Sequence, residues 1–510
     1  MTDAPDVAPD RPFAVVDLGS NSARMIVFRL REREHLDVLE DARAPLRLAR
    51  DLRDGEALGP DAIARTLEAL HDFRAVADGA GATRIIAVAT SAIRDAVDGD
   101  TLVRQARRLG FPVQVIGGDL EARLGFLGAV HDLSVTSGFT MDVGGGSLEL
   151  SRFVERKLDA SWTVPLGSLR VSDRFLENDP PTDKELRKLR DHVAGQLAGT
   201  GTSELGKHQD LVGIGGTVRN LAKVDLRRTD EPLPLLHGYE LSERRLAAIA
   251  DDLAERSMKR RAQMSGLNPD RADSIVGGVF VVLGVMRHLG ARRLIVSSRG
   301  LREGLALDAF DRDVPPASWV RAISVATLAT RFATWDEAPA ARRASIAARL
   351  HDALDPAAPI AVGEMLEHAA TLLDIGRAID YYDRFEHAAM IAMAADLAGF
   401  THTDLGAVVT ILRQGADDAR PGPYARLVDE ADLPAIERAA AALLLADELN
   451  RRIPPGMPAP VSCNWLRDGF EVVAPVPAGW RPRGVADRFA QVFGRPLLVV
   501  ASDVLPAPDF

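Results

Sequence analysis

The first apolar segment of the chain is broken at one point only. Residues 13–30 read FAVVDLGSNSARMIVFRL, in which two short runs rich in Val, Ile and Phe flank a single acid followed by small polar residues. Short β-branched and aromatic runs bounded by turn residues favour strands over a helix. The pattern therefore predicts a β-hairpin that places Asp17 at the mouth of a loop formed by Ser20, Asn21 and Ser22.

The N-terminal part of the chain continues as alternating helices and strands. Helical spacing over 59–81 precedes a strand-like run, RIIAVA, and a helix at about 100–109 precedes the run FPVQVIG. The segment GFTMDVGGGSLELSRF then repeats the order strand, acid (here Asp142), glycine-rich turn and strand. Helical and strand patterns alternate again up to residue 298. This repetition predicts an internal duplication of an α/β domain.

The pattern changes after Pro315 and Pro316, which form a plausible linker. Alanine-rich helical segments dominate as far as residue 450, and the runs FEVVAPV and PLLVVAS then flank a further helix. We therefore predict five parts of the chain: a disordered tail at 1–10, α/β domains at 11–125 and 126–308, a helical domain at 317–450, and a small α+β domain at 451–510.

The overall charge limits the partners of this protein. The 510 residues carry a net charge of −11 at neutral pH, and an acidic surface repels nucleic acids and anionic membranes unless basic residues gather locally.

A single cysteine, Cys463, excludes an internal disulfide framework. No uncharged run approaches the roughly 18 residues that a membrane helix needs. These features predict a cytoplasmic protein in which any anionic ligand binds at a focused site.

The two acid-bearing hairpins are the first candidate site. Glycine permits close approach of backbone N–H groups to an anion, so the loop Gly144, Gly145, Gly146 and Ser147 is a candidate phosphate cradle. If Asp17 and Asp142 face each other across a cleft, a divalent cation would have to separate them from a phosphate. Each loop could instead be an ordinary hairpin turn.

A third glycine cluster follows a strand and opens a helix. Gly215, Gly216 and Thr217 stand at the start of this predicted helix, and a helix N-terminus offers free N–H groups and a favourable dipole to a phosphate oxygen. Taken alone, this signal is weak, because glycine-rich turns are common.

Three further side chains are candidates with an open alternative. Glu121 opens a helix that must cross from one half to the other, so it could serve as a general base in a cleft or could only complement the helix dipole. Arg94 could bind phosphate or lie in solvent. Strand alternation places Glu149 on the face opposite Leu148 and Leu150, which could be a metal-facing or a wet face.

The ordered blocks VVDLGSNSARMIVF, AVATSAIRDA, VIGGDLEARLGFLGA, MDVGGGSLELS, VPLGSLRVSDRF, GIGGTVRNLAK, NPDRADSIVGG and SSRGLREGLAL resemble the Ppx/GppA family of exopolyphosphatases and guanosine pentaphosphate phosphohydrolases. The resemblance implies two duplicated actin-like (ribonuclease H-like) α/β domains around a phosphate-binding cleft. It implies that Glu121 activates water and that Asp142, Glu149 and Asp17 belong to a magnesium site, with a monovalent cation such as K⁺ as a possible addition. It further implies phosphate contacts from Ser20, Asn21, Ser22, Arg94, Gly144, Gly145, Gly146, Ser147, Gly215, Gly216 and Thr217, and leaves the role of Arg299 open.

The C-terminal half resembles the helical, HD-like domain of the same family. Leu373 stands before Asp374 where an active HD phosphohydrolase would have histidine, and the pair His351-Asp352 lacks a convincing set of partners, although His387 is present. We therefore expect this domain to extend a polyanion channel or to build a homodimer rather than to hold a metal.

The resemblance leads to one principal hypothesis and several alternatives. The principal hypothesis is processive release of terminal orthophosphate from inorganic polyphosphate. The first alternative is hydrolysis of the 5′ γ-phosphate of guanosine pentaphosphate, and a small-molecule kinase or a non-catalytic nucleotide sensor ranks lower.

Overall fold

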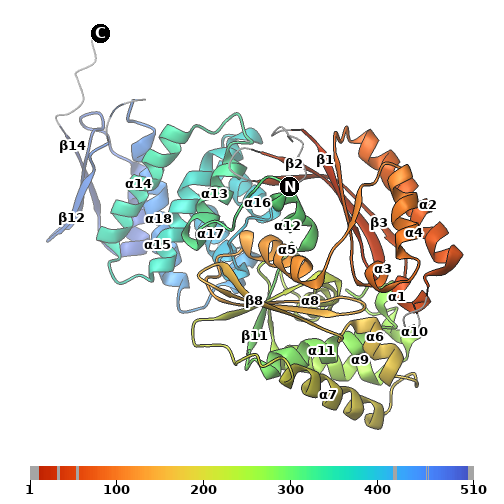
Figure 1. Ribbon diagram of the computed structural model, residues 1–510. Coiled ribbons are helices and arrows are strands. Elements are labelled where there is room, and N and C mark those ends of the chain that lie inside the picture. Colours follow the sequence, from red (N-terminus) through yellow and green to blue (C-terminus); the bar gives the residue numbers. More distant parts are fainter. Residues whose placement is uncertain are drawn as a thin grey trace. The chain divides into compact units, whose positions relative to one another are not determined.

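The computed structural model describes residues 11–31, 35–52, 57–416, 422–454, 457 and 459–502 (Figure 1). The predicted tail at 1–10 lies outside this range. The chain divides into two compact units, Met1–Val320 and Arg321–Phe510. No helix in the described part of the chain is both long enough and apolar enough to cross a membrane.

The first lobe of the N-terminal unit contains a five-stranded sheet in the order β3-β2-β1-β4-β5. Alternate residues of β1 face two different cores: Ala14 and Val16 pack with the helices α2 and α4, whereas Phe13 and Val15 pack with α5 (Gly118–His131) and α12 (Leu301–Asp308). This explains why the run FAVV is apolar throughout. The elements are β1 (Phe13–Leu18), β2 (Ser22–Leu30), β3 (Leu36–Pro45), α1 (Leu48–Asp51), α2 (Gly59–Gly79), β4 (Ile85–Ala89), α3 (Ser91–Asp95), α4 (Gly99–Arg108) and β5 (Val113–Val115).

The second lobe repeats this plan in a six-stranded sheet with the order β10-β11-β9-β6-β7-β8. In both lobes an antiparallel three-stranded meander is followed by a strand that pairs in parallel with the first strand of the meander. The predicted duplication is thereby confirmed. The elements are β6 (Gly138–Val143), β7 (Leu148–Val154), β8 (Lys157–Val164), α6 (Ser168–Phe175), α7 (Asp183–Ala198), β9 (Asp210–Ile214), α8 (Gly215–Thr229), β10 (Glu240–Ser242), α9 (Glu243–Glu255), α10 (Met258–Arg261), the 3₁₀ turn η2 (Pro269–Arg271), α11 (Ile275–His288) and β11 (Arg293–Val296).

Two helices, α5 (Gly118–His131) and α12 (Leu301–Asp308), pack against each other between the lobes (Figure 1). Leu124 of α5 joins the core of the first lobe, whereas Phe126 and Val130 join a core with β9 and β11 of the second lobe. Because α5 contributes to both cores, its position couples the two lobes.

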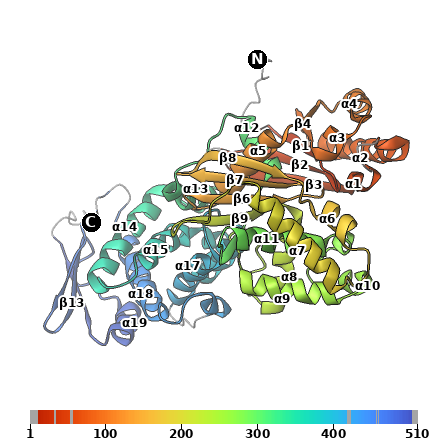
Figure 2. The same ribbon diagram turned by 60° about the horizontal axis from the view of Figure 1, so that its bottom comes forward.

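The second unit is mainly helical and ends in a three-stranded sheet with the order β12-β13-β14. Within this unit α19 packs against α18 (Figure 2). The side chain of Arg488 donates to that of Glu437 at 3.1 Å. The elements are α13 (Ala317–Ala329, which begins in the first unit), α14 (Glu337–Leu354), α15 (Ile360–Leu372), η3 (Leu373–Ala378), α16 (Arg384–Ala394), α17 (His402–Gln414), η4 (Pro423–Leu427), α18 (Leu433–Asn450), β12 (Ser462–Leu466), β13 (Gly469–Ala474), α19 (Arg483–Phe493) and β14 (Leu497–Ala501).

Candidate active site

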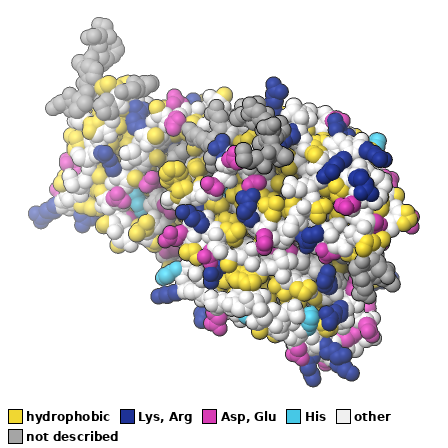
Figure 3. Space-filling view, in the orientation of Figure 1, with side chains coloured by type: hydrophobic (Ala, Val, Ile, Leu, Met, Phe, Trp, Pro, Cys, Tyr) yellow, Lys and Arg dark blue, Asp and Glu magenta, His cyan; other side chains and the backbone are white. Residues whose placement is uncertain are grey.

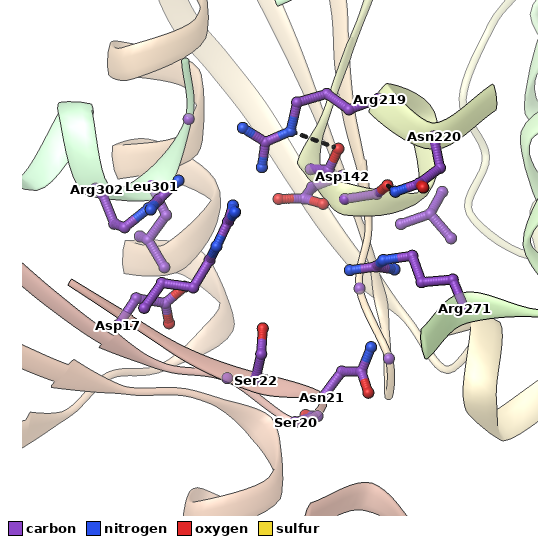
Figure 4. A pocket seen from close by; sticks show the side chains of 18 of the residues that line it. Asp17, Ser20, Asn21, Ser22, Asp142, Arg219, Asn220, Arg271, Leu301 and Arg302 are labelled. Atoms are coloured by element: carbon purple, nitrogen blue, oxygen red, sulfur yellow. Dashed lines mark hydrogen bonds between the residues drawn. The ribbon is translucent and has the colours of Figure 1, made fainter. Parts of the chain in front are cut away.

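A cavity of about 600 Å³ lies between the two lobes of the N-terminal unit (Figure 4). Both hairpin loops, the first turn of α5 and the start of α8 line it. Twelve of the residues singled out in the sequence are among its lining residues: Asp17, Ser20, Asn21, Ser22, Glu121, Asp142, Gly144, Gly145, Ser147, Glu149, Gly215 and Gly216. Arg94, Gly146 and Thr217 are not.

The duplicated hairpins place one acid at equivalent points of the two lobes. Asp17 stands near the end of β1, directly opposite Arg24 of β2, and Asp142 stands near the end of β6, directly opposite Glu149 of β7. Residues opposite each other in an antiparallel pair share a sheet face. Each acid therefore points into the cavity together with its cross-strand partner, which is a cation in one lobe and a second carboxylate in the other.

The glycine loop of the second lobe is fixed by the start of α6. The backbone N–H of Ser168 donates to the carbonyl of Gly144 at 2.8 Å, and that of Leu169 donates to Gly145 at 3.1 Å. A Cβ atom at Gly167 would lie 2.2 Å from the carbonyl carbon of Gly146, so this contact requires glycine. The loop's peptide planes are thus set by packing rather than by the loop's own sequence.

The third glycine cluster brings a helix N-terminus to Asp142. Gly215 has φ of +80°, and a Cβ atom there would lie 2.0 Å from Oδ1 of Asp142. Only glycine allows this approach, which puts the positive end of the α8 dipole beside the carboxylate. Thr217 is fully buried, and its hydroxyl donates to the carbonyl of Val143 at 2.8 Å, so it connects α8 to β6.

Four carboxylates crowd the floor of the cavity. Burial raises the pKa of Asp17 to about 6, with a further contribution from Asp142. Burial also raises the pKa of Asp142, of Glu121 and of Glu149, and the neighbouring carboxylates raise the pKa of the last two further. Such mutual repulsion is relieved by a proton or by a bound cation.

The donor set fits a hard divalent cation. Oδ1 of Asp17, Oε2 of Glu121 and Oε1 of Glu149 are buried and have no hydrogen-bond partner among the described residues. In the same part of the chain, no three His, Cys, Asp or Glu side chains converge closely enough to hold a metal by themselves. Magnesium commonly binds through one or two carboxylates and completes its octahedron with water and substrate oxygen. The arrangement therefore fits magnesium held jointly with a phosphate.

Arg94 is placed beside the candidate base rather than in the cavity lining. Its Nη1 donates to the carbonyl of Ile116 at 2.9 Å and lies 3.7 Å from Oε2 of Glu121. Its charge partly offsets the increase in the pKa of Glu121. The geometry thus assigns Arg94 a contact with Glu121.

Sequence reasoning considered one basic residue of the cavity lining, Arg299, and missed the others, which come from several elements (Figure 4). Burial, together with neighbouring arginines, lowers the pKa of Arg219 and that of Arg271 to about 10. Arg219 follows Gly215 by one helical turn, and its Nε donates to the Gly215 carbonyl at 3.1 Å. The basic side chains that line the cavity are Arg24, Arg43, Arg219, Lys223, Arg271, Arg299 and Arg302.

These cations repel each other unless an anion lies between them. All of these residues except Arg43 stood in the quoted motif blocks, and the spacing of Arg219 from Gly215 was a usable signal. On the outer face shown in Figure 3, by contrast, acidic and basic side chains are interspersed. Seven basic side chains thus line one cavity of a protein whose net charge is −11.

Comparison with known proteins agrees with this picture. Residues 26–313 match the model of the Ppx/GppA phosphatase family, and residues 320–480 match Ppx/GppA phosphatase, domain III. The chain is thus a phosphatase hydrolase with two actin-like lobes. It belongs to the Ppx/GppA phosphatase family.

Its relatives match about three-fifths of the chain. Exopolyphosphatase 1 of Mycobacterium tuberculosis is 28% identical over 318 residues, which cover 61% of this chain and 92% of that protein. Exopolyphosphatase 2 of the same species is 32% identical over 310 residues, covering 58% and 97%. The crystal structure of the Aquifex aeolicus Ppx/GppA family member is similar with 25% identity and a TM-score of 0.52, covering 59% of this chain and 97% of that one.

Proposed function

We propose that this protein is an exopolyphosphatase that releases terminal orthophosphate from inorganic polyphosphate. The observation that carries the proposal is the concentration of five arginines and a lysine (Arg24, Arg43, Arg219, Arg271, Arg302 and Lys223) around a carboxylate cluster in one cavity. The guanidinium group of an arginine can donate two parallel hydrogen bonds to two oxygens of one phosphate. A chain of phosphates offers a charge to each cation.

In the proposed reaction Glu121 acts as general base. The oxygen of a water molecule attacks the terminal phosphorus, the water proton passes to the Glu121 carboxylate, and the bond from phosphorus to the bridging oxygen breaks. A raised pKa makes Glu121 a better proton acceptor once it is ionised. Arg94 would hold its carboxylate, and the loops around Ser20 and Gly145 would hold the phosphoryl oxygens.

Magnesium is the cofactor proposed for this site, with Asp142 and Glu149 as ligands and Asp17 as a further candidate. When bound, it would neutralise the carboxylates and stabilise charge on the phosphoryl oxygens.

A second phosphohydrolase activity, on the 5′ γ-phosphate of guanosine pentaphosphate, would use the same residues. A guanine base would be expected to stack on an aromatic side chain, but among the described residues none of the cavity-lining side chains is aromatic. Polyphosphate is therefore the preferred substrate in this proposal.

The test measures phosphate release from long polyphosphate, guanosine pentaphosphate and ATP, each with and without magnesium. Glu121→Gln should lower kcat by about 100- to 10,000-fold, the usual contribution of a general base, while polyphosphate binding changes little. Glu68→Gln, on the exposed face of α2, is the matched control and should be neutral. Undiminished turnover by Glu121→Gln would remove Glu121 from the mechanism, and preferential hydrolysis of guanosine pentaphosphate would favour the alternative substrate.

A further inference from the structure

A row of ion pairs joins the two lobes near the cavity. On the first lobe, arginines stand at the end of β3 and around α1, and on the second lobe, aspartates stand on α6 and on either side of Arg271. We call this set the arginine latch. Its members are Arg43, Arg47 and Arg50 on the first lobe and Asp173, Asp270 and Asp273 on the second.

The pair Arg50–Asp273 is the best-formed member of the latch. Nη2 of Arg50 lies 2.8 Å from Oδ2 of Asp273, whereas the other pairs of the latch are 3.6–3.9 Å apart. The side chain of Asp273 is 13% exposed, whereas those of Asp173 and Asp270 are 52% and 46% exposed, so water screens the pairs of Asp273 less than the pairs of these two aspartates. Arg47 and Arg50 are not among the cavity-lining residues. Their position fits a contact between lobes better than a contact with substrate.

Each side of the latch is connected directly to a phosphate-facing element. On the first lobe, the N–H groups of Leu46 and Arg47 both donate to the carbonyl of Asn21 at 2.9 Å. On the second lobe, Asp273 follows Arg271 by two residues, and both Arg271 and Asn21 line the cavity. The latch thus joins the segment that holds the carbonyl of Asn21 to the segment that carries Arg271 on the opposite wall.

We infer that Arg50 and Asp273 are positioning residues. Their ion pair holds the two lobes close enough together for both phosphate loops to contact one substrate molecule. The pair sets this separation without contacting the phosphate. The inference rests on the proposed function for its kinetic consequences, but the lobe separation itself can be measured on the free protein.

The direction in which one substitution changes kcat/KM distinguishes the latch from simple charge repulsion between Asp273 and the substrate. Removal of the negative charge of Asp273 near a polyanion site would strengthen substrate binding if the charge acted only through repulsion. If Asp273 holds the lobes together, Asp273→Asn instead lowers kcat/KM for polyphosphate about fivefold, as expected for loss of a pair at the upper end of the exposed range. An increase in kcat/KM would overturn the inference.

Charge exchange provides the second arm of the experiment. Arg50→Asp and Asp273→Arg should each lower kcat/KM, and the double variant should recover most of it because the pair is restored with opposite polarity. A substrate-contacting Arg50 would not be rescued in this way. The matched control exchanges Arg228 and Asp252, an ion pair between α8 and α9, and should change neither kcat nor KM.

Lobe separation is measured directly with a pair of spin labels. Labels at Ala64→Cys on α2 and Ala194→Cys on α7, both exposed, are introduced into a Cys463→Ser background of the full chain. The label distance should lengthen or broaden in Arg50→Asp and in the milder Arg50→Gln, and should return in the charge-exchanged double variant. An unchanged distance in both single variants would overturn the latch. A distance change in a protein that does not cleave polyphosphate would retain the latch and reject the proposed substrate.

Discussion

At the scale of single residues, the position opposite the hairpin acid carries a different side chain in each lobe. The residue opposite the acid is Arg24 in the first lobe and Glu149 in the second. A duplicated hairpin therefore supplies one wall with an acid and a cation, and the other with two acids. In the proposed function, Arg24 of the first wall would contact a phosphate oxygen, and the two acids of the second wall would hold the metal ion.

Gly167 gives the sharpest residue-scale prediction. In Gly167→Ala the new Cβ atom would collide with Gly145 and Gly146, at 2.4 and 2.2 Å from their carbonyl carbons, so the phosphate loop must move. Displacement of a positioning element by about 1 Å can cost about 100-fold in rate, and we expect kcat/KM to fall by about that factor. Steady-state kinetics and circular dichroism would check the result.

The control for this substitution is Gly195→Ala. Gly195 lies on α7, and nothing is within 4 Å of a Cβ atom placed there. This variant should keep full activity and gain slightly in stability, because alanine is the better helix former. Equal activity of the two variants would show that the loop tolerates the displacement.

The sequence predicted the acids and glycines of the site better than its cations. Asp17 and Asp142 stood out because each interrupts an apolar run. Arginines do not stand out in this way, because most arginines of a protein lie on its surface. Arg24, Arg43 and Arg271 are brought together only when β2, β3 and η2 meet in space, which no local pattern records.

At the scale of elements, α5 is anchored at both ends. Arg94 lies beside Glu121 in its first turn. At the other end, the guanidinium of Arg156 donates to the carbonyls of Val130 and Leu133 at 2.8 and 2.7 Å. These contacts satisfy carbonyls that a helix end leaves without partners. The helix that carries the proposed base is therefore held at both ends.

The C-cap residue Asp132 gives a prediction about pH. A carboxylate is unfavourable at a helix C-terminus, but Oδ1 of Asp132 lies 2.6 Å from Nδ1 of His131, and Oδ2 accepts from Nε of Arg299 at 3.1 Å. Although burial opposes the charge, His131 and Arg299 lower the pKa of Asp132 well below its usual value. A carboxyl with a depressed folded-state pKa stabilises the protein above its unfolded pKa of about 3.9.

We therefore expect Asp132→Asn to be less stable than the parent protein at neutral pH. The difference should be constant above about pH 5 and should shrink as the pH falls below about 4, because Asp132 of the unfolded parent chain then takes up a proton that the folded protein does not bind. Thermal unfolding measured from pH 7 to pH 3 would check this. Asp159→Asn, which removes the exposed pair with Arg152, should show a small effect throughout.

Three strands that were missed in the sequence share a physical cause. The hairpins were predicted with two strands each, yet β3 and β8 add a third, and β12 precedes the predicted strand β13. These three strands are largely exposed or half-buried, and each is an edge strand of its sheet. An edge strand with little apolar surface leaves a weak pattern, because its pairing partner rather than its own burial defines it.

At the scale of the whole chain, each unit has a buried centre of its own. In the second unit, this centre includes charged groups: Arg343, 2% exposed, lies 2.8 Å from Asp374 and 3.3 Å from Asp447, which also binds Arg384. Asp374 is the acid that follows Leu373 in the segment that the sequence analysis compared with an HD phosphohydrolase. Its carboxylate is thus engaged by a guanidinium in this structure.

This division predicts that the two units unfold in separate steps, and that Arg343→Met affects only one of them. Removal of Arg343 leaves Asp374 without its closest buried cation, which typically costs about 3–5 kcal/mol. For a unit of this size the loss corresponds to a decrease in Tm of about 10 °C. Calorimetry should show one transition moved and the other unchanged, with Arg349→Met, on an exposed position of the same helix, as the control. If a single transition moved as a whole, the two units would form one cooperative structure, since a substitution confined to one core would then destabilise both.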